Sequence, residues 1–317
     1  MNKFSKDLRL IFGTPEEKAK AKAEKNNTII LDFSGLFWAS YFVYKKHIDK
    51  SDDSVNFLVF LVLNNIISVR NKFPNYKNVV IAIDSGSWRK DVFKYYKAQR
   101  RLKRSEKPEE FQLLYERLDN IIEELKANLP FKFISVKKAE ADDVIGVLTE
   151  YLINEKGFEN ILIISRDRDF KQLLKFEQVK LYDPIDNKMI EEDNPELYLI
   201  NHIINGDKGD GIPNVFSEDN VFLSGKRQKA FTKKKKEELL EKGLDQFIID
   251  NGVVQNYNRN RKLIELSMEN IPSEIVEKII KAYEEYKPVK ADLGKVVGLM
   301  KKYEIKSLLD KANLLLI

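Results

Sequence analysis

The sequence of 317 residues predicts an α/β fold, in which a central and mainly parallel sheet is flanked by helices and followed by a smaller, mostly helical C-terminal domain. Two observations support this prediction. From residue 27 to about residue 186, short apolar runs alternate with longer amphipathic segments, a pattern typical of strand-helix-strand units in a parallel sheet. After about residue 186 the apolar runs end, and the remaining segments have helical spacing.

Strands are expected at five apolar runs. In chain order these runs are TIILD (28–32), NVVIAID (78–84), FKFISV (131–136), NILIIS (160–165) and VKLYD (179–183). Residues 55–70 and 111–129 lie between strands and have apolar residues at helical spacing, so each is expected to form a helix that packs on the sheet. Residues 272–286 and 295–316 are expected to be C-terminal helices for the same reason.

The changes of pattern divide the chain into three predicted parts. Residues 1–26 are polar and rich in Ala, Lys and Glu after a short amphipathic start, and we expect them to form an extension outside the core. Residues 27–190 would form the α/β domain, and residues 191–317 the helical domain.

The composition excludes several kinds of site. The chain has no cysteine, which excludes disulfides, thiolate zinc sites, iron-sulfur clusters and cysteine nucleophiles. With His47 and His202 as the only imidazoles, a catalytic metal is expected to be held by oxygen, which favours Mg²⁺ or Mn²⁺. No run of 18 or more apolar residues and no signal peptide is present, so we expect a cytoplasmic protein without a membrane span.

Acidic residues follow three of the predicted strands. Asp32 and Asp84 end the first two apolar runs, and Asp167 and Asp169 lie shortly after the fourth. Because the carboxyl ends of parallel strands lie along one edge of a sheet, these acids are expected at one rim. In an extended segment Asp167 and Asp169 would also point to the same side. A single Asp is explained by a turn or a helix cap, but recurrence at three strand ends favours a site.

A second group of acids precedes a predicted helix. The stretch EADDVIGVLTEYL places Glu140, Asp142 and Asp143 before or within the first turn, where free amides and the helix dipole favour negative charge. Three acids within four residues exceed what capping requires.

A third group lies on a glycine-rich loop. The stretch INGDKGDGIPN carries Asp207 and Asp210, and its glycines allow tight turns. If all these carboxylates converge, each pair about 4 Å apart repels by roughly 4 kcal/mol at an effective dielectric near 20. Two divalent ions would remove this repulsion and would support an in-line phosphoryl displacement.

Basic residues gather in two stretches, SWRKDVFKYYKAQRRLKR (87–104) and GKRQKAFTKKKK (225–236). The net charge of +5 is the small difference between 55 basic and 50 acidic residues, so the distribution of charge is more informative than the sum. Such stretches are typical of polyanion contacts, although solvated helix faces would have the same pattern.

Five of these stretches, in order, resemble motifs of the 5′ nuclease or flap endonuclease superfamily, and most closely its T-even phage ribonuclease H branch. They are IILDFSGLFW, VVIAIDSGSWRKDVFKYYKAQR, EADDVIGVLTEYL, LIISRDRDFKQLL and INGDKGDGIPNV, and together they span residues 29–215. The order of five motifs makes the resemblance specific, whereas any one motif alone would be weak.

The resemblance implies two Mg²⁺ ions, for which Mn²⁺ would substitute. The implied metal ligands are Asp32, Asp84, Glu140, Asp142, Asp143, Asp167, Asp169, Asp207 and Asp210. In the family, one ion is shared mainly by the strand-end acids and the Glu140 and Asp142 pair, and the second is held by Asp167, Asp169 and Asp207. The helical domain would therefore contribute Asp207 and Asp210 to the active site.

The resemblance also implies an arch or gateway at about residues 86–110. In this arch Lys97 and Arg100 would lie one turn apart, face the scissile phosphate and act as catalytic residues. Other basic side chains are expected to bind nucleic acid, namely Arg89, Lys90, Lys94, Arg101, Lys226, Arg227 and Lys229. The arch aromatics Trp88, Phe93, Tyr95 and Tyr96 are expected either to pack in the core or to stack on unpaired bases. Residues 214–236 lack the glycines of the family's duplex-gripping hairpin, which puts a potassium site there in doubt.

The implied activity is that of a phosphodiester hydrolase, a metal-dependent 5′ to 3′ exonuclease and flap endonuclease. It would remove RNA primers and adjacent DNA from lagging-strand fragments, acting on RNA-DNA hybrid, duplex DNA and 5′ flap DNA. The family works beside a sliding clamp and a single-strand binding protein, and FSKDLRLIF (4–12) and LDKANLLLI (309–317) are candidate docking peptides. We expect a monomer, encoded by a phage and acting in the host cytoplasm.

Two other functions remain open from the sequence. One is a non-catalytic, structure-specific DNA-binding protein in which the acids only cap turns; it would bind branched DNA in a salt-sensitive manner without hydrolysis. The other is a PIN-type endoribonuclease, which shares an acidic sheet edge but is usually shorter and lacks the arch and the helical domain. Cleavage of free single-stranded RNA would favour the second.

Overall fold

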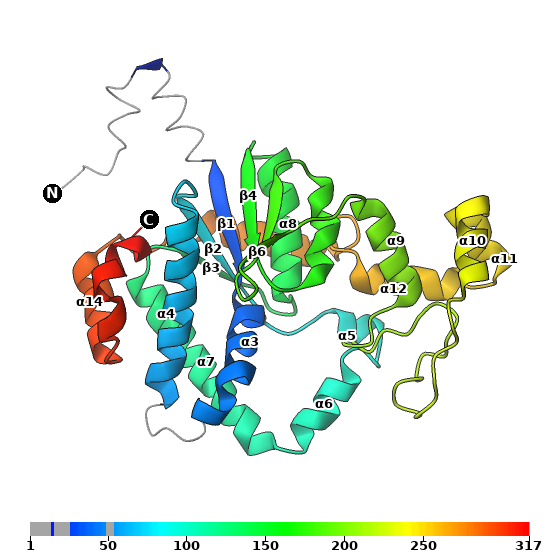
Figure 1. Ribbon diagram of the computed structural model, residues 1–317, viewed down its shortest axis with the longest axis horizontal. Coiled ribbons are helices and arrows are strands. Elements are labelled where there is room, and N and C mark those ends of the chain that lie inside the picture. The colour runs from blue at the N-terminus through cyan, green and yellow to red at the C-terminus, as the bar shows by residue number, and fades with distance from the viewer. Residues whose placement is uncertain (1–13, 16–25, 49–53, 317) are drawn as a thin grey trace.

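A six-stranded sheet forms the centre of the computed structural model, which describes residues 14–15, 26–48 and 54–316 (Figure 1). The strand order is β3-β2-β1-β4-β5-β6, and every pair of neighbours is parallel except β5 and β6. The strands are β1 (Asn27–Asp32), β2 (Asn78–Ile83), β3 (Lys132–Ser135), β4 (Asn160–Ile164), β5 (Val179–Asp183) and β6 (Lys188–Ile190). The predicted fold class and the five predicted strands are confirmed.

The sixth strand corrects the expectation that strands end near residue 186. β6 pairs antiparallel with β5 after a tight turn. Asp183 forms this turn, because its Oδ1 accepts hydrogen bonds from the amides of Ile185, at 2.9 Å, and Asp186, at 3.0 Å. Three residues are too few to show a strand period in the sequence.

The helices follow in chain order. They are α3 (Phe33–Ile48), α4 (Ser54–Lys72), α5 (Arg89–Val92), α6 (Ala98–Ser105), α7 (Pro108–Asn128), α8 (Ala141–Asn154), α9 (Pro195–Asn205), α10 (Lys233–Lys242), α11 (Leu244–Asp250), α12 (Val254–Ile264), α13 (Ser273–Glu285) and α14 (Leu293–Lys302). Two 3-10 helices, η1 (Arg168–Lys175) and η2 (Lys306–Leu315), complete the described elements. Helices were predicted at α4, α7, α8 and α13, and these are confirmed. The single helix expected over residues 295–316 is instead α14 followed by η2, because the chain turns at Glu304, which has a positive φ of 56°.

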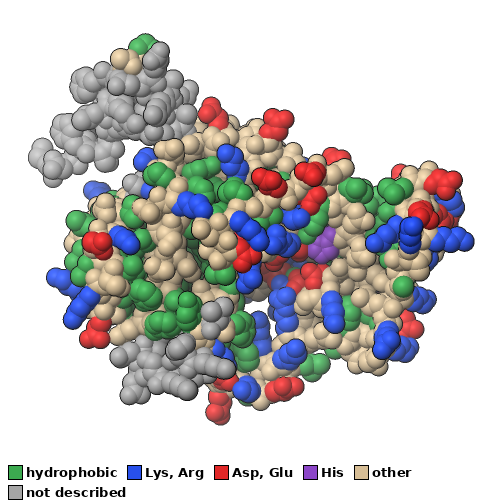
Figure 2. Space-filling view, in the orientation of Figure 1, with side chains coloured by type: hydrophobic (Ala, Val, Ile, Leu, Met, Phe, Trp, Pro, Cys, Tyr) green, Lys and Arg blue, Asp and Glu red, His purple; other side chains and the backbone are tan. Residues whose placement is uncertain are grey.

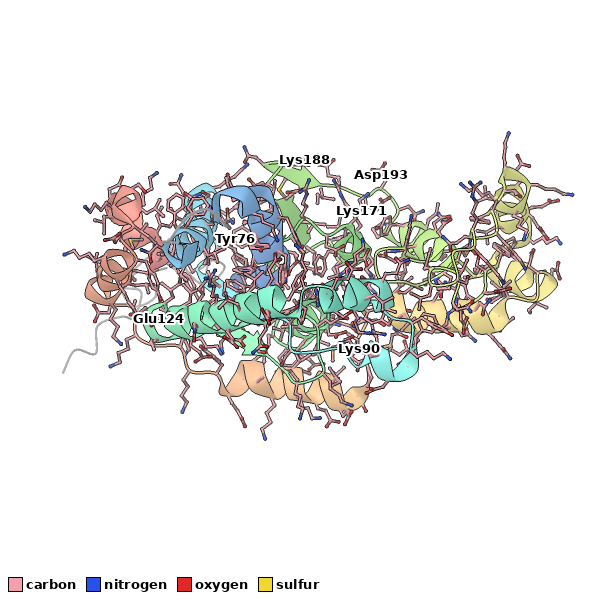
Figure 3. All side chains as sticks on the ribbon, turned by 90° about the horizontal axis from the view of Figure 1, so that it is seen from below. Tyr76, Lys90, Glu124, Lys171, Lys188 and Asp193 are labelled. Carbon is pink, nitrogen blue, oxygen red and sulfur yellow. The ribbon has the colours of Figure 1, made fainter. Side chains whose placement is uncertain are left out.

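Alternate residues of the buried strands belong to two hydrophobic cores, one on each face of the sheet. In β1, Ile29 and Leu31 pack with α3, α4, α7, α14 and η2 on one face of the sheet, while Ile30 packs with α8, η1 and α13 on the other. Figure 3 shows the long helix α7, which carries Glu124. The central strands are therefore covered on both faces, as parallel strands require.

The helices after β6 pack in three different places. α9, α11 and α12 form a third core with the turn of the arch, in which Phe93, Tyr96 and Phe247 are buried. α13 joins the core around α8, and α14 and η2 join the core around α4 and α7. The predicted boundary near residue 190 stays a prediction, since the later helices contact both faces of the sheet as well as the arch.

The C-terminal segment is part of the hydrophobic core. Leu308, Ala312 and Leu315 are buried against α4 and α7. Ala312 and Leu315 are therefore not available to a partner, while Leu309, Leu314 and Leu316 are partly buried, so a docking role of residues 309–317 stays a prediction. The other candidate, residues 4–12, lies outside the described residues. In the described part of the chain, no helix is both long and apolar enough to cross a membrane.

We predict that Gly146→Ala destabilises the fold by about 1–3 kcal/mol. Gly146 lies in α8 where the chain of Leu266 crosses it, and a Cβ there would lie 2.5 Å from the Leu266 carbonyl oxygen. Gly298→Ala in α14 is the matched control, because a Cβ there meets nothing within 4 Å and Ala favours a helix by up to about 1 kcal/mol. Urea denaturation measures both variants, and equal stability of the two would contradict the prediction.

Candidate active site

The strand order brings three of the predicted acids to one edge of the sheet. β1 lies between β2 and β4, so the carboxyl ends of these parallel strands are adjacent. Asp32 is the last residue of β1, Asp84 directly follows β2, and Asp167 follows β4. Together with Asp142 from the first turn of α8, they line a cavity of about 480 Å³. We call Asp32, Asp84, Asp142 and Asp167 the rim cluster.

Asp32 is the most enclosed member of the rim cluster. Its side chain is only 4% exposed, and it accepts hydrogen bonds from the Gly35 amide at 2.8 Å and from the Ser165 hydroxyl at 2.7 Å. The parallel register pairs Leu31 with Ile164, which places the next residues, Asp32 and Ser165, side by side. Burial is the main cause that raises the pKa of Asp32 to about 7, and the charges of Asp84 and Asp167 add to it.

Asp167 and Asp169 reach the site differently from the prediction. The segment is not an extended strand at both positions, because η1 begins at Arg168. Asp167 caps this 3-10 helix and accepts a hydrogen bond from the Asp169 amide at 2.9 Å. A capped helical turn, rather than strand alternation, therefore sets the directions of the two carboxylates.

Asp169 belongs to a second group, which contains a histidine. His202 projects from α9 between two acids: its Nδ1 lies 3.4 Å from Asp169 Oδ1 and its Nε2 lies 3.7 Å from Asp207 Oδ2. One donor atom from each of the three residues can be chosen so that all lie within 4.8 Å of one another. Figure 2 shows acidic side chains beside a histidine in the hollow at the centre of this face, with lysines and arginines around it. We call Asp169, His202 and Asp207 the mixed cluster.

His202 was not among the residues predicted for the site. The expectation that oxygen atoms hold the metal stays a prediction, although the structure places an imidazole between two of the predicted acids. His202 lies in the last turn of the helix that precedes the Asp207 loop, and this closeness in sequence is the signal that could have indicated it.

The charges within the mixed cluster influence one another. Burial chiefly raises the pKa of Asp169 to about 8, and the charge of Asp167 acts in the same direction. Burial acts to raise the pKa of Asp207 as well. The nearby His202 and the amide of Asp210 outweigh burial, so the pKa of Asp207 is lowered. The pKa of His202 is raised, because the two acids outweigh the effect of its burial.

The arch is built from two short helices rather than one. α5 ends at Val92, a turn follows, and Lys97 precedes α6 with a positive φ of 52°. This turn directs Lys97 and Arg100 into the cavity that the rim cluster lines. The Lys97 amide donates to the Asp210 carbonyl oxygen at 2.6 Å, which ties the arch to the acidic loop.

Two predicted metal ligands are held by cations of the arch. Lys97 Nζ contacts Glu140 and lies 3.4 Å from Asp210 Oδ2, and Arg100 Nη2 lies 2.9 Å from Asp210 Oδ1. The Tyr96 hydroxyl donates to Glu140 at 2.7 Å and lies 2.9 Å from Asp210. Burial acts to raise the pKa of Glu140, but the charges of Lys97 and Arg89 outweigh it and lower the pKa to about 2. Glu140 is thus ionised throughout the physiological range.

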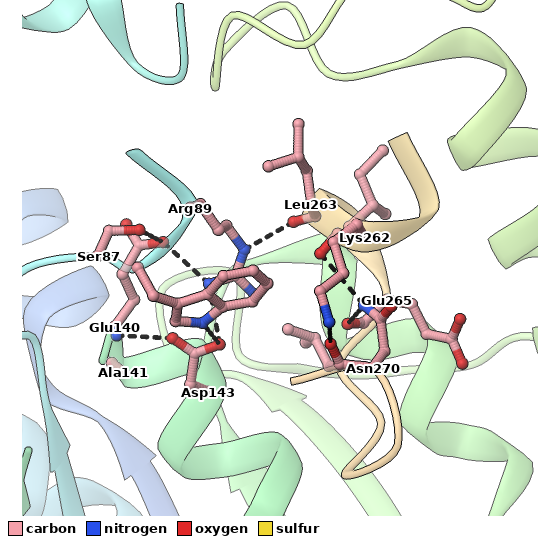
Figure 4. A network of polar contacts seen from close by, with 12 residues as sticks. Ser87, Arg89, Glu140, Ala141, Asp143, Lys262, Leu263, Glu265 and Asn270 are labelled. Atoms are coloured by element: carbon pink, nitrogen blue, oxygen red, sulfur yellow. Dashed lines mark hydrogen bonds and ion pairs between the residues drawn. The ribbon is translucent and has the colours of Figure 1, made fainter. Parts of the chain in front are cut away.

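Arg89 and Asp143 correct two predictions (Figure 4). Arg89 is 2% exposed, and its guanidinium lies 2.9 Å from Asp143 and 3.2 Å from Glu140, while its Nε donates to the Leu263 carbonyl at 2.7 Å. Asp143 is fully buried and also accepts from Trp88 Nε1 at 3.2 Å. Arg89 therefore cannot contact nucleic acid directly, and Asp143 has no oxygen directed to the cavity. Their role is to position Glu140.

The other predicted nucleic-acid contacts are exposed. Lys90 lies on α5 (Figure 3), and the rest are Lys94, Arg101, Lys226, Arg227 and Lys229. Their contact with nucleic acid stays a prediction. Of the arch aromatics, Trp88, Phe93 and Tyr96 are buried, which confirms the interpretation of these three as core residues.

The residues present fit divalent metal ions. The rim cluster offers only carboxylate oxygens, which suit hard cations. Crowding and burial raise the pKa of Asp32 and Asp142, as expected where like charges have no compensating cation. A divalent ion in the same place would favour the ionised carboxylates.

An acidic sheet edge below a basic arch is the arrangement of a nuclease, and comparisons with known proteins agree. A family model described as "5′-3′ exonuclease, N-terminal resolvase-like domain" matches residues 27–198, and one described as "T4 RNase H, C terminal" matches residues 193–314. Ribonuclease H of Enterobacteria phage T4 is 30% identical over 274 residues, which cover 83% of this chain and 88% of that protein. The chain belongs to the 5′-3′ exonuclease family and is a homologue of that ribonuclease H.

Further relatives and solved structures are similar over different lengths. A 5′-3′ exonuclease of Mycoplasmopsis pulmonis is 30% identical over 50% of this chain and 48% of that protein. A bacteriophage T5 protein co-crystallised with metal ions has a TM-score of 0.62 at 19% identity, over 81% of this chain and 98% of that chain. A complex of the T5 flap endonuclease with DNA and metal ions has a TM-score of 0.58 at 18% identity, over 82% and 100%. At these identities the two structures show the fold.

We predict that the metal-free protein loses stability as the pH rises from about 4 to about 8. The pKa values of Asp32 and Asp169 in the fold, about 7 and about 8, lie above the usual 3.8, so the folded state binds these protons more tightly than the unfolded chain. Each tenfold difference in proton affinity corresponds to about 1.4 kcal/mol. Thermal unfolding in EDTA should show this loss, and excess Mg²⁺ should remove it by binding the ionised acids. A metal-free Tm that rises across this pH range would contradict the prediction, and Asp169→Asn should reduce the pH dependence.

Proposed function

We propose that the protein is a two-metal-ion 5′ to 3′ exonuclease and flap endonuclease that removes RNA primers and adjacent DNA from lagging-strand fragments during phage replication. The observation that carries the proposal is the meeting of four carboxylates, Lys97 and Arg100 in one cavity. Membership in the 5′-3′ exonuclease family supports the reaction class.

The rim cluster and the two acids of the mixed cluster, Asp169 and Asp207, are proposed to hold two Mg²⁺ ions, for which Mn²⁺ would substitute. Bound ions of this kind lower the pKa of water and neutralise charge on phosphate oxygens. Glu140 and Asp210 complete the proposed ligand set, and the Lys97 ammonium lies between them.

Lys97 and Arg100 are proposed to bind the scissile phosphate. Burial acts to lower the pKa of Lys97, but the charges of Asp210 and Glu140 outweigh it and raise the pKa, so its ammonium persists at any physiological pH. Arg100 lies one helical turn further on and is about half exposed. Both cations are fixed to acids before substrate arrives, so they stabilise developing negative charge with little reorganisation.

The cavity also offers a surface for unpaired nucleotides. Trp38, Phe42 and Phe111 line it together with Lys103 and Arg104. The Arg104 guanidinium carbon lies 5.8 Å from the Trp38 ring centre and 5.9 Å from that of Phe111. Aromatic rings beside arginines are typical of single-strand binding. This supports a 5′ single strand below the arch, with Lys226, Arg227 and Lys229 proposed to contact the duplex of an RNA-DNA hybrid or flap substrate.

The cellular setting follows from the same proposal. A monomer would act in the host cytoplasm beside a sliding clamp and a single-strand binding protein. Residues 4–12 remain a candidate clamp-docking segment, and unchanged clamp stimulation after deletion of residues 1–12 would exclude them.

We predict that Asp167→Asn abolishes cleavage and largely preserves duplex binding, because Asp167 lies in the rim cluster and its charge also acts on Asp169 of the mixed cluster. The assay uses a 5′-labelled RNA-primed duplex and a matched 5′ flap, with Mg²⁺ or with EDTA. The matched control is Asp193→Asn, which removes an exposed acid outside the cavity.

Each result of this assay distinguishes the functions that were open from the sequence. Short products that need Mg²⁺ and are lost in Asp167→Asn establish the nuclease. Tight binding without hydrolysis in any metal would instead support the DNA-binding protein. Cleavage of free single-stranded RNA, without preference for an annealed 5′ end, would support the PIN-type endoribonuclease.

We predict that Lys97→Ala lowers kcat by about 100-fold to 1000-fold, the usual cost of losing one preorganised group that stabilises transition-state charge. KM should change little. The exposed Lys94 of the same arch provides the comparison, since Lys94→Ala should raise KM in a salt-dependent manner and leave kcat near the original value. Steady-state kinetics on the flap substrate separates the two, and equal loss of kcat in both variants would contradict the role of Lys97.

A further inference from the structure

His202 is a buried side chain in the site for which the proposed reaction has no role. It is 13% exposed, and its Nδ1 is buried without a hydrogen-bond partner among the described residues. The two ring nitrogens face different acids, Asp169 at 3.4 Å and Asp207 at 3.7 Å. Both distances exceed the usual 2.7–3.2 Å of an N–H···O hydrogen bond, so the ring is not acting as a tight hydrogen-bond clamp.

The backbone fixes the position of His202 relative to Asp207. The Gly206 amide donates to the His202 carbonyl oxygen at 2.8 Å, and Gly206 ends α9 with a φ of 67°. A Cβ at Gly206 would lie 2.3 Å from the Ile212 carbonyl oxygen, so only glycine allows the chain to turn here. The turn sends Asp207 back beside the last turn of α9, next to the imidazole.

The distances suit the shared coordination of one ion. Ligand atoms about 2.1 Å from one ion lie about 3 Å apart when they are neighbours and about 4.2 Å apart when they are opposite. The distances of 3.4 Å and 3.7 Å belong to different ring nitrogens, but one ligand atom from each of the three residues can be chosen so that all lie within 4.8 Å of one another. A rotation of the ring that turns one nitrogen toward both carboxylates would place three ligand atoms around one ion.

We propose that Asp169, His202 and Asp207 form a mixed nitrogen and oxygen site, which makes one of the two metal positions of this protein prefer Mn²⁺ to Mg²⁺. Mg²⁺ takes oxygen ligands in a strict octahedron, whereas imidazole suits transition metals. The rim cluster contains carboxylates alone, so the two positions differ in their chemistry. This inference rests on the proposed function, because it describes the metal selectivity of the same site.

The experiment detects the metal-nitrogen bond directly in the full-length protein. Mn²⁺ is added to the wild-type chain, binding is measured from the free-ion signal in electron paramagnetic resonance, and nitrogen coupling is measured by electron spin-echo modulation. The chain has only two histidines, so the single change His202→Asn identifies the source of the coupling. His202→Gln is a second variant in case Asn disturbs folding, which circular dichroism reports.

Wild-type protein should show nitrogen coupling, and both His202 variants should lose it and bind one Mn²⁺ at least about tenfold more weakly. The affinity for Mg²⁺, measured by competition with Mn²⁺, should fall by a smaller factor than the affinity for Mn²⁺ in these variants. Asn201→Ala, on the same helix but with its side chain bonded to the Leu197 carbonyl, is the matched control and should retain both the coupling and the affinity. Bound Mn²⁺ without nitrogen coupling, or coupling that persists in the variants, would overturn the inference.

The result also separates this inference from the proposed nuclease activity. Cleavage of the flap substrate with Mn²⁺ bound but without nitrogen coupling overturns the mixed site alone. Nitrogen coupling without any cleavage supports the mixed site and overturns the nuclease.

Discussion

Repulsion between carboxylates at one sheet edge is the constraint on which the rest of the structure depends. Two unit charges about 4 Å apart repel by roughly 4 kcal/mol at an effective dielectric near 20, and this edge gathers many acids. The protein meets the constraint in two ways. Asp32 and Asp169 have raised pKa values, so they can take up protons when no cation is present. Glu140 and Asp210 are paired with Lys97 instead. Both arrangements are reversible, which keeps the acids available for divalent ions.

The end of α12 holds two acid-bearing segments in place, the start of α8 and the 3-10 helix η1. The Leu263 carbonyl accepts a hydrogen bond from Arg89, which in turn positions Glu140 at the start of α8. At the next residues, buried Gln172 of η1 donates to the Ile264 carbonyl at 3.2 Å and accepts from the Leu266 amide at 2.8 Å. Residues from the C-terminal half thus fix side chains at the carboxyl ends of the strands, which explains why the site needs the helices after β6.

Local sequence patterns were sufficient to predict the fold and the position of most acids of the site. The carboxyl ends of strands in a parallel sheet lie at one edge, and this does not depend on the conformation of the loops. Local patterns failed where the decisive contact is distant in sequence. Arg89 lies in a basic stretch that looks like a surface, and only its contacts with Asp143 and Leu263 show that it is buried. His202 has ordinary helical spacing, and its partner Asp169 is contributed by another element. β6 is simply too short to show a period.

The rim cluster and the mixed cluster take their residues from different parts of the molecule. Three of the four rim acids follow neighbouring strands and the fourth begins α8, so their spacing is set by one rigid sheet and the helix packed on it. In the mixed cluster, Asp169 comes from η1, which packs on the sheet, whereas His202 and Asp207 belong to α9 and its loop, which pack with the arch. An ion held by these three residues would fasten the sheet to the α9 side of the site. Metal binding at this position would therefore stabilise the packing of η1 against α9, which already contact each other.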